Sequence, residues 1–186
     1  FHDQRTDTKK TYCETEGIKS YVSYLNREAN KLHPEPIYIT GRSGDIEVEV
    51  AFQYTENFNE QINSYCNCIN VVDGGTLVTG FKTALTRVMN QYARELGVLK
   101  DKDENFDGKD IRNGIVTIIS IKHPDPQFEG QTKNKLGNPE VRGYVDKVMS
   151  EYFAYYLEEH PDVAKKIVNK ATLAARARKA ARAARD

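Results

Sequence analysis

One short stretch of the chain, residues 46–54, constrains the fold more than any other. Apolar side chains stand at every second position there and alternate with residues that are mostly polar, including Glu47 and Glu49. A period of two is that of a β-strand with one face buried and the other facing water. The segments on either side, including 61–69, also read as strands, so we expect a three-stranded antiparallel meander over residues 37–70.

One apolar run and several amphipathic segments complete the expected fold. Residues 115–121 are almost continuously apolar, which predicts a strand covered on both faces. Apolar residues at helical spacing predict helices over about 17–30, 81–96, 138–160 and 162–186, and Asp107 or Asp110 predicts a short helical turn. We therefore expect an α+β fold with two layers, in which helices cover one face of a mostly antiparallel four-stranded sheet.

The charges divide the chain into two regions. Its 27 basic and 27 acidic residues cancel to a formal net charge of zero, which excludes a uniformly basic surface for binding polyanions. Residues 161–186 nevertheless carry eight basic and two acidic side chains, a local charge of +6, so the other 160 residues carry −6. No run of 18 apolar residues is present, so we expect no membrane span.

Motifs for self-contained catalysis are missing from the sequence. The segment 75–83 approaches a phosphate-binding loop, but Phe81 separates Gly80 from Lys82 where that motif requires adjacent Gly-Lys-Thr. We interpret it as the glycine-rich start of a helix, whose N-terminus could also hold an anion. The four histidines are scattered, and neither they nor the three cysteines have metal-ligand spacing, so we predict no metal site.

A long polar loop is the first candidate site. Gln131, Thr132 and Lys133 lie in a stretch of about ten residues that has few apolar anchors, and such loops in compact domains are often functional. The residues alone leave two interpretations open. The loop is either an ordinary solvated loop, or it carries a lysine and an amide donor that grip a phosphate group.

The last predicted helix is the second candidate site. The apolar face that begins with Val163 and Ile167 continues as an arginine stripe made of Arg178, Arg182 and Arg185, whereas Arg176 faces another way. Two interpretations again remain open. The end of the helix is either a soluble helical linker or a surface for the phosphate backbone of a nucleic acid.

Taken together, these features resemble the transducer domain found in the ATPase subunit of bacterial type IIA topoisomerases, either DNA gyrase or topoisomerase IV. The segments that carry the resemblance are 16–19, 24–26, 48–54, 73–76, 80–87, 124–128, 131–133 and 174–182. They cover nearly the whole chain. The sequence departs from the family pattern at Leu77, where a histidine is usual, and at Cys68, where an asparagine is usual.

The resemblance implies an intermediate module of a larger enzyme. Residues 1–15 would be the end of a preceding ATPase domain of the GHKL type and a linker, 16–160 the transducer domain, and 161–186 an exit helix toward a TOPRIM domain. The implied fold contains a left-handed βαβ crossover, against the usual right-handed rule. The implied whole protein is a cytoplasmic, ATP-hydrolysing DNA topoisomerase that supercoils DNA, and the isolated fragment is expected to be inactive.

The resemblance also implies the site residues and partners. Gln131 and Lys133 would reach the γ-phosphate of an ATP bound with Mg²⁺ in the neighbouring domain, where Lys133 would stabilise the charge of phosphoryl transfer. This chain alone would bind no cofactor. The residues implied to contact duplex DNA are Arg178, Arg182, Arg185 and Arg176. The implied protein partners are a gyrase A-type subunit and a second copy of the ATPase subunit. The alternative is a stand-alone nucleic-acid-binding scaffold with no link to ATP.

Overall fold

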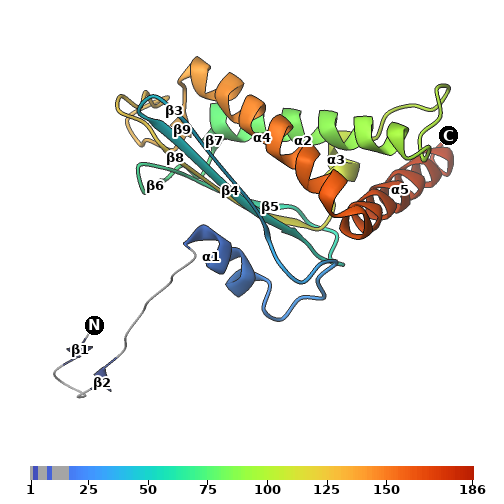
Figure 1. The fold of residues 1–186 in the computed structure, drawn as a ribbon, viewed down its shortest axis with the longest axis horizontal. Helices are drawn as coiled ribbons and strands as arrows, with labels where there is room; N and C mark the ends of the chain where they lie inside the picture. The colour runs from blue at the N-terminus through green and yellow to red at the C-terminus, as the bar shows by residue number, and fades with distance from the viewer. Residues whose placement is uncertain (1, 4–7, 10–16) are drawn as a thin grey trace.

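The computed structural model describes residues 2–3, 8–9 and 17–186. Two short strands, β1 (His2–Asp3) and β2 (Thr8–Lys9), pair with each other, and the rest of the predicted 1–15 linker lies outside the described residues. From residue 17 onward the chain combines a five-stranded sheet with helices, the last of which is long (Figure 1). The predicted α+β class is therefore confirmed.

The order of strands in the sheet differs from the expected meander. The main strands are β3 (Ile37–Ser43), β4 (Ile46–Tyr54), β5 (Gln61–Cys66) and β8 (Ile115–Lys122). Strand β8 lies between β4 and β5, antiparallel to β4 and parallel to β5, so the prediction that β5 pairs with β4 is wrong. Because β8 is apolar on both faces, it takes a central position that helices cover on each side.

A fifth strand comes from a turn at a place where the sequence pattern predicts a continuous strand. Asn67 and Cys68 have φ values of 48° and 65°, and they join β5 to the short strand β6 (Ile69–Asn70) as a two-residue hairpin turn. Two consecutive positive φ values are typical of the turns whose twist matches that of paired strands. The predicted single strand over 61–69 and the count of four strands are thus wrong.

The helices lie close to where the apolar spacing predicted them. They are α1 (Ile18–Leu25), α2 (Thr76–Glu95), α3 (Gly108–Ile111), α4 (Pro139–Glu159) and α5 (Pro161–Ala183). The short turn α3 begins with a capping box of Asp107 and Asp110, as those two residues predicted. Helix α2 connects the parallel neighbours β5 and β8, so the structure contains the expected βαβ crossover, whose hand stays a prediction.

Helices cover both faces of the sheet rather than one. Helices α2 and α4 lie side by side on one face, and α1 lies on the other (Figure 1). Under α1, Val22 packs against Ala51 and Ile118 in a small second core. Since the second half of β4 is covered in this way, only its first half, with the part-exposed Glu47 and Glu49, has the water-facing side that the alternation predicted.

The main core fills the space between the sheet and the layer of α2 and α4. Phe52 contacts Phe81 and Phe153 edge to face, with ring centroids 5.8 and 5.3 Å apart. The two helices approach closely at Gly80, where a Cβ atom would lie 2.5 Å from the carbonyl oxygen of Arg142. Helix α5 joins this core along its first 15 residues, through Ala164, Ile167, Val168, Ala171 and Ala175.

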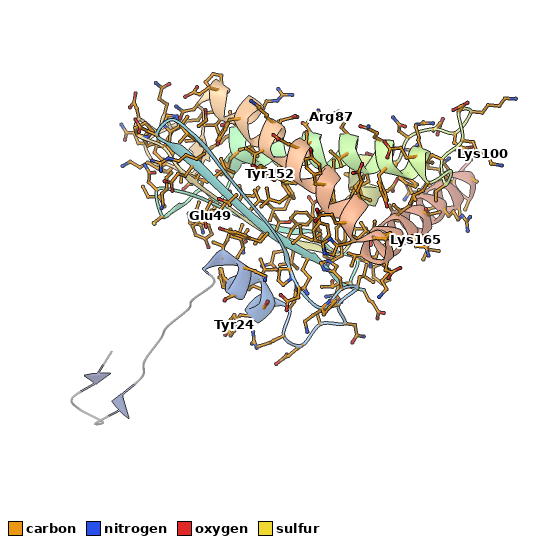
Figure 2. The ribbon with its side chains drawn as sticks, viewed as in Figure 1. Tyr24, Glu49, Arg87, Lys100, Tyr152 and Lys165 are labelled. Carbon is orange, nitrogen blue, oxygen red and sulfur yellow. The ribbon has the colours of Figure 1, made fainter. Side chains whose placement is uncertain are left out.

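The side chains that point away from these cores are mostly polar or aromatic. Figure 2 shows Arg87 and Tyr152 at the layer of α2 and α4, and Tyr24 on the opposite side of the sheet. Tyr24 and Tyr152 are about half exposed. No helix in the part of the chain that the structure describes is long and apolar enough to cross a membrane.

Candidate functional site

The loop of residues 123–138, between β8 and α4, folds as a narrow hairpin. The N–H of Gly137 donates to the carbonyl oxygen of Gln127 at 2.7 Å, and the N–H of Glu129 donates to that of Lys135 at 2.8 Å. The side chains of Lys135 and Glu129 form an ion pair at 3.0 Å. Composition alone marks this stretch as an irregular loop, but hydrogen bonds and an ion pair connect its outgoing and returning arms.

The hairpin is also docked against the start of α2. The short strands β7 (Gly74–Gly75) and β9 (Lys135–Leu136) pair in parallel, and Gly75 is the N-cap residue of α2. Gly75 has a φ of 110°, and a Cβ atom there would lie 2.0 Å from the carbonyl oxygen of Leu136, so only glycine fits. The glycine-rich segment is thus the start of a helix, as predicted, and it receives the returning arm of the loop.

The tip of the hairpin presents two polar side chains to solvent. Gln131 and Lys133 are exposed, and neither side chain has a hydrogen bond or an ion pair within the described part of the chain. Lys133 adopts a φ of 55°, in the left-handed region that costs a residue with a Cβ atom about 1 kcal/mol. Strain of this kind is concentrated at functional sites. The loop therefore holds a free cation and a free amide on a firm base.

The four arginines that are predicted to contact DNA differ in their surroundings. Arg176, Arg182 and Arg185 are exposed. Arg178 instead turns to the body, where its Nε donates to Oδ1 of Asp110 at 3.0 Å and its Nη2 to Oδ2 at 2.8 Å. The hydrogen bond to Asp110 raises the pKa of Arg178 above its usual value. Arg178 thus fastens α5 to α3, and the freely exposed arginines lie on either side of it.

The two candidate sites lie far apart. The hairpin loop and β9 are at one end of the sheet, and the C-terminal end of α5 is at the other end of the molecule (Figure 1). The structure therefore does not combine Lys133 and the arginines into one binding site. Any coupling between them has to pass through the body of the fold.

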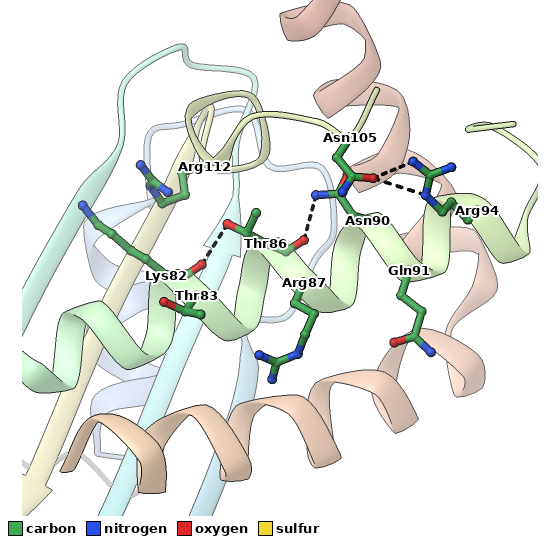
Figure 3. A pocket seen from close by; sticks show the side chains of 9 residues that line it. All are labelled: Lys82, Thr83, Thr86, Arg87, Asn90, Gln91, Arg94, Asn105 and Arg112. Carbon is green, nitrogen blue, oxygen red and sulfur yellow. Dashed lines mark hydrogen bonds between the residues drawn. The ribbon is translucent and has the colours of Figure 1, made fainter. Parts of the chain in front are cut away.

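A polar groove of about 660 Å³ along α2 is a feature that the sequence pattern did not predict (Figure 3). Its cations already have partners. Lys82 and Arg112 both pair with Glu60, at 3.4 and 2.5 Å, and Arg87 pairs with Asp146. Burial would raise the pKa of Glu60, but the hydrogen bond and charge of Arg112 and the charge of Lys82 lower it overall. The groove is lined by Lys82, Thr83, Thr86, Arg87, Asn90, Gln91, Arg94, Asn105 and Arg112.

Comparison with known sequences places the chain in one family. A family model described as DNA gyrase B matches residues 17–186. The DNA gyrase B protein of Bacillus mycoides is 53% identical over 178 residues, which are 96% of this chain and 44% of the relative. That of Enterococcus faecalis is 52% identical over 180 residues, 97% of this chain and 28% of the relative. The chain belongs to the DNA gyrase B family, and it spans less than half the length of these curated relatives.

Solved structures give the same result for the fold. The 43K ATPase domain of Thermus thermophilus gyrase B, crystallised with an aminocoumarin, superposes with a TM-score of 0.91 at 39% identity and covers 100% of this chain and 50% of that one. The topoisomerase IV ATP binding domain of Francisella tularensis reaches 0.80 at 28% identity and covers 95% and 47%. The mixed α+β fold with its long last helix is therefore shared with these structures.

Proposed function

We propose that residues 16–160 and the exit helix 161–186 are the transducer module of a gyrase-type, ATP-dependent type II DNA topoisomerase. In this role the chain couples ATP binding and hydrolysis in a preceding ATPase domain to the passage and supercoiling of DNA. Membership of the DNA gyrase B family and the fold shared with gyrase B and topoisomerase IV structures support the proposal. The alternative of an unrelated nucleic-acid-binding scaffold has no comparable support.

The observation that carries this proposal is the free tip of the 123–138 loop. Lys133 and Gln131 offer a cation and an amide donor, the groups that phosphate oxygens accept hydrogen bonds from. An ATP with its Mg²⁺ in the neighbouring domain would supply the γ-phosphate as the ligand. Lys133 would then stabilise the negative charge that develops during phosphoryl transfer, and Gln131 would orient the same group. Loss of this contact after hydrolysis would release the loop.

The end of α5 is the proposed surface for duplex DNA. Arg182 and Arg185 are exposed in a segment where nearly every residue after Arg178 is exposed, and Arg176 is exposed just before it. Arginines at this spacing can follow a phosphate backbone. Arg178 contributes by holding the helix in place through Asp110, and it reaches DNA only if that ion pair opens.

The rest of the proposal concerns the complete protein. Its partners would be a gyrase A-type subunit, a second copy of its own subunit, and a TOPRIM domain that follows α5. Such a protein would work in the cytoplasm, where bacterial DNA lies.

The test is the ATPase activity of the full-length subunit carrying Lys133→Ala. We expect ATP turnover to be lost while nucleotide still binds, because the substitution removes only the charge delivered to the γ-phosphate. Lys102→Ala is the control, since Lys102 is also an exposed lysine in a loop. It is two residues from Lys100, which lies at the opposite end of the helical layer from β9 (Figures 1 and 2). Near-normal hydrolysis by the Lys133 variant would contradict the proposal.

A further inference from the structure

Asn138 lies where the returning arm of the 123–138 loop enters α4, and its side chain serves the loop rather than the helix. It is the N-cap residue of α4 and is only 2% exposed, yet it forms no side-chain cap. An N-cap asparagine normally accepts an N–H from the first turn of its own helix. Here its Oδ1 accepts the N–H of Gln127 at 2.6 Å, and its Nδ2 donates to the carbonyl oxygen of Asp125 at 3.2 Å. Asn138 therefore fastens the outgoing arm to the returning one.

A histidine and a glutamate extend this connection. Oε1 of Glu140 accepts a hydrogen bond from Nδ2 of Asn138 at 3.0 Å and lies 3.0 Å from Nε2 of His123. The N–H of Asp125 donates to Nδ1 of His123 at 3.0 Å. Because Nδ1 accepts, the ring proton belongs on Nε2, which donates to Glu140. Both arms of the loop are thus bound to one carboxylate at the start of α4.

A second asparagine ties the same point to the sheet. Asn67, in the turn between β5 and β6, accepts the N–H of His123 with its Oδ1 and donates with its Nδ2 to the carbonyl oxygen of His123, both at 2.9 Å. The four residues Asn67, His123, Asn138 and Glu140 form what we call the loop bracket. The bracket fixes the loop where it leaves β8 and where it enters α4. Within the described residues, the side chains of Gln131 and Lys133 at the tip have no hydrogen bond or ion pair of their own.

We propose that Asn138 is a positioning residue for ATP hydrolysis: through the loop bracket it sets where Lys133 and Gln131 meet the transferred phosphate. This inference rests on the proposed function of the tip. Asn138 touches no reacting atom in this role, and its effect reaches the phosphate only through the placement of the hairpin. A misplacement of about 1 Å lowers a rate on the order of a hundredfold, so a loosened base translates into a slow chemical step.

The experiment measures ATP hydrolysis by the full-length subunit carrying Asn138→Ala. We expect kcat to fall roughly ten- to a hundredfold, while KM and nucleotide affinity change by less than about twofold. Asn26→Ala is the matched control, because Asn26 is also 2% exposed, caps an end of α1 and bonds to Gln53 at 3.0 Å, far from the loop. We expect it to lower thermal stability to a similar degree and leave kcat unchanged.

Two further variants separate positioning from a general structural role. Asn138→Asp keeps the acceptor for Gln127 but sets a second carboxylate against Glu140, so it is combined with Glu140→Gln, whose amide can donate to the new carboxylate. We expect this double variant to recover part of the lost kcat. In a Lys133→Ala background, Asn138→Ala should lower the residual rate no further, because the bracket acts only through the tip.

Each result has a distinct meaning. Unchanged kcat in Asn138→Ala, with an inactive Lys133→Ala, overturns the positioning role and leaves the proposed function standing. An equal loss of kcat in Asn138→Ala and Asn26→Ala also overturns it, since a loss of fold stability then suffices. Normal hydrolysis by Lys133→Ala overturns the proposed function, and this inference with it.

Discussion

A shorter loop, 97–107, and a longer one, 123–138, each lead into a helix, and they are held in different ways. In the 97–107 loop, which precedes α3, contacts with the body run up to Lys100 and Asp103, on either side of the exposed Lys102. The guanidinium of Arg94 donates to the carbonyl oxygens of Lys100 and Asp103, and the side chain of Asn90 bonds both backbone groups of Phe106. In the 123–138 loop, the bonds stop below the tip, and Gln131 and Lys133 remain free among the described residues.

The two loops also differ in whether their charged side chains have partners within the chain. The backbone of the 97–107 loop bonds to Arg94 and Asn90 on α2, and Glu104 lies 3.8 Å from Lys179 on α5, so this loop packs against the chain itself. Lys133 in the 123–138 loop has no internal counter-charge in the described residues, and its backbone is strained. A loop that is firm at its base, strained at its tip and free to offer a cation there is the arrangement that the proposed function requires.

The largest effect is expected where the 97–107 loop ends. Arg178→Ala leaves the Asp110 carboxylate, whose side chain is 4% exposed, without its partner, and an unpaired buried charge is strongly destabilising. We expect a clear drop in the melting temperature of this chain, measured by calorimetry. Arg182→Ala is the control and should leave the melting temperature unchanged, because Arg182 is exposed on the surface. Equal melting temperatures of the two variants would contradict the fastening role of Arg178.

A smaller effect is expected from Asn90→Ala, which unties the middle of the 97–107 loop. It leaves the N–H and carbonyl oxygen of Phe106 buried without partners, and we expect a loss of about 2 kcal/mol in the free energy of unfolding. Urea unfolding measures the loss. The ATPase rate of the full-length subunit should stay unchanged, since this loop presents no side chain to the nucleotide. A large drop in that rate would remove the contrast between the two loops.

The smallest effect on stability is expected at the tip of the 123–138 loop, where it tests the backbone strain at Lys133. Lys133→Gly removes the Cβ atom from a left-handed position, which relieves strain but adds freedom to the unfolded chain. We expect a net gain of roughly 0.5 kcal/mol in stability together with a loss of ATP turnover. Lys102→Gly, at a loop position without positive φ, should be neutral or destabilising. A loss of stability in Lys133→Gly would show that the tip is not strained.

The local spacing of apolar residues predicted most helices and strands, but it did not predict which strands pair with each other. The spacing in α2 and α4 and the Asp107–Asp110 cap are properties of short segments, so they could be predicted from the sequence. That β8 lies between β4 and β5 could not, because the pairing joins segments far apart in the chain. The positive φ at Asn67 and Cys68 is equally hidden, since neither residue is glycine.

In the candidate sites, too, some features could be read from the sequence and others arise only from contacts in the folded chain. Composition singled out the loop of Gln131 and Lys133 but left an ordinary solvated loop open. Their role at a phosphate comes from the family resemblance and stays a prediction. The loop bracket was not foreseen, because Asn67 and His123 are 56 positions apart and meet only in the folded chain. Helical geometry placed Arg178 on the face of α5 that packs against the body, but its buried partner Asp110 lies 68 positions earlier and could not be foreseen. DNA contact by the arginines stays a prediction.

The central position of β8 determines when this sheet can form during synthesis. The hairpin of β3 and β4 is complete once residue 54 is made, but β5 finds its parallel partner only after residue 122. Until then β5 has no neighbour in the sheet except the two residues of β6. The surfaces of α2 and β3 that α4 covers also stay open, because α4 follows β8 in the chain. Pairing across such a separation is slow to form, so the nascent chain passes through a stage that invites aggregation. Truncation before β8 should therefore leave no folded sheet, whereas truncation within the exposed end of α5 should leave the fold intact.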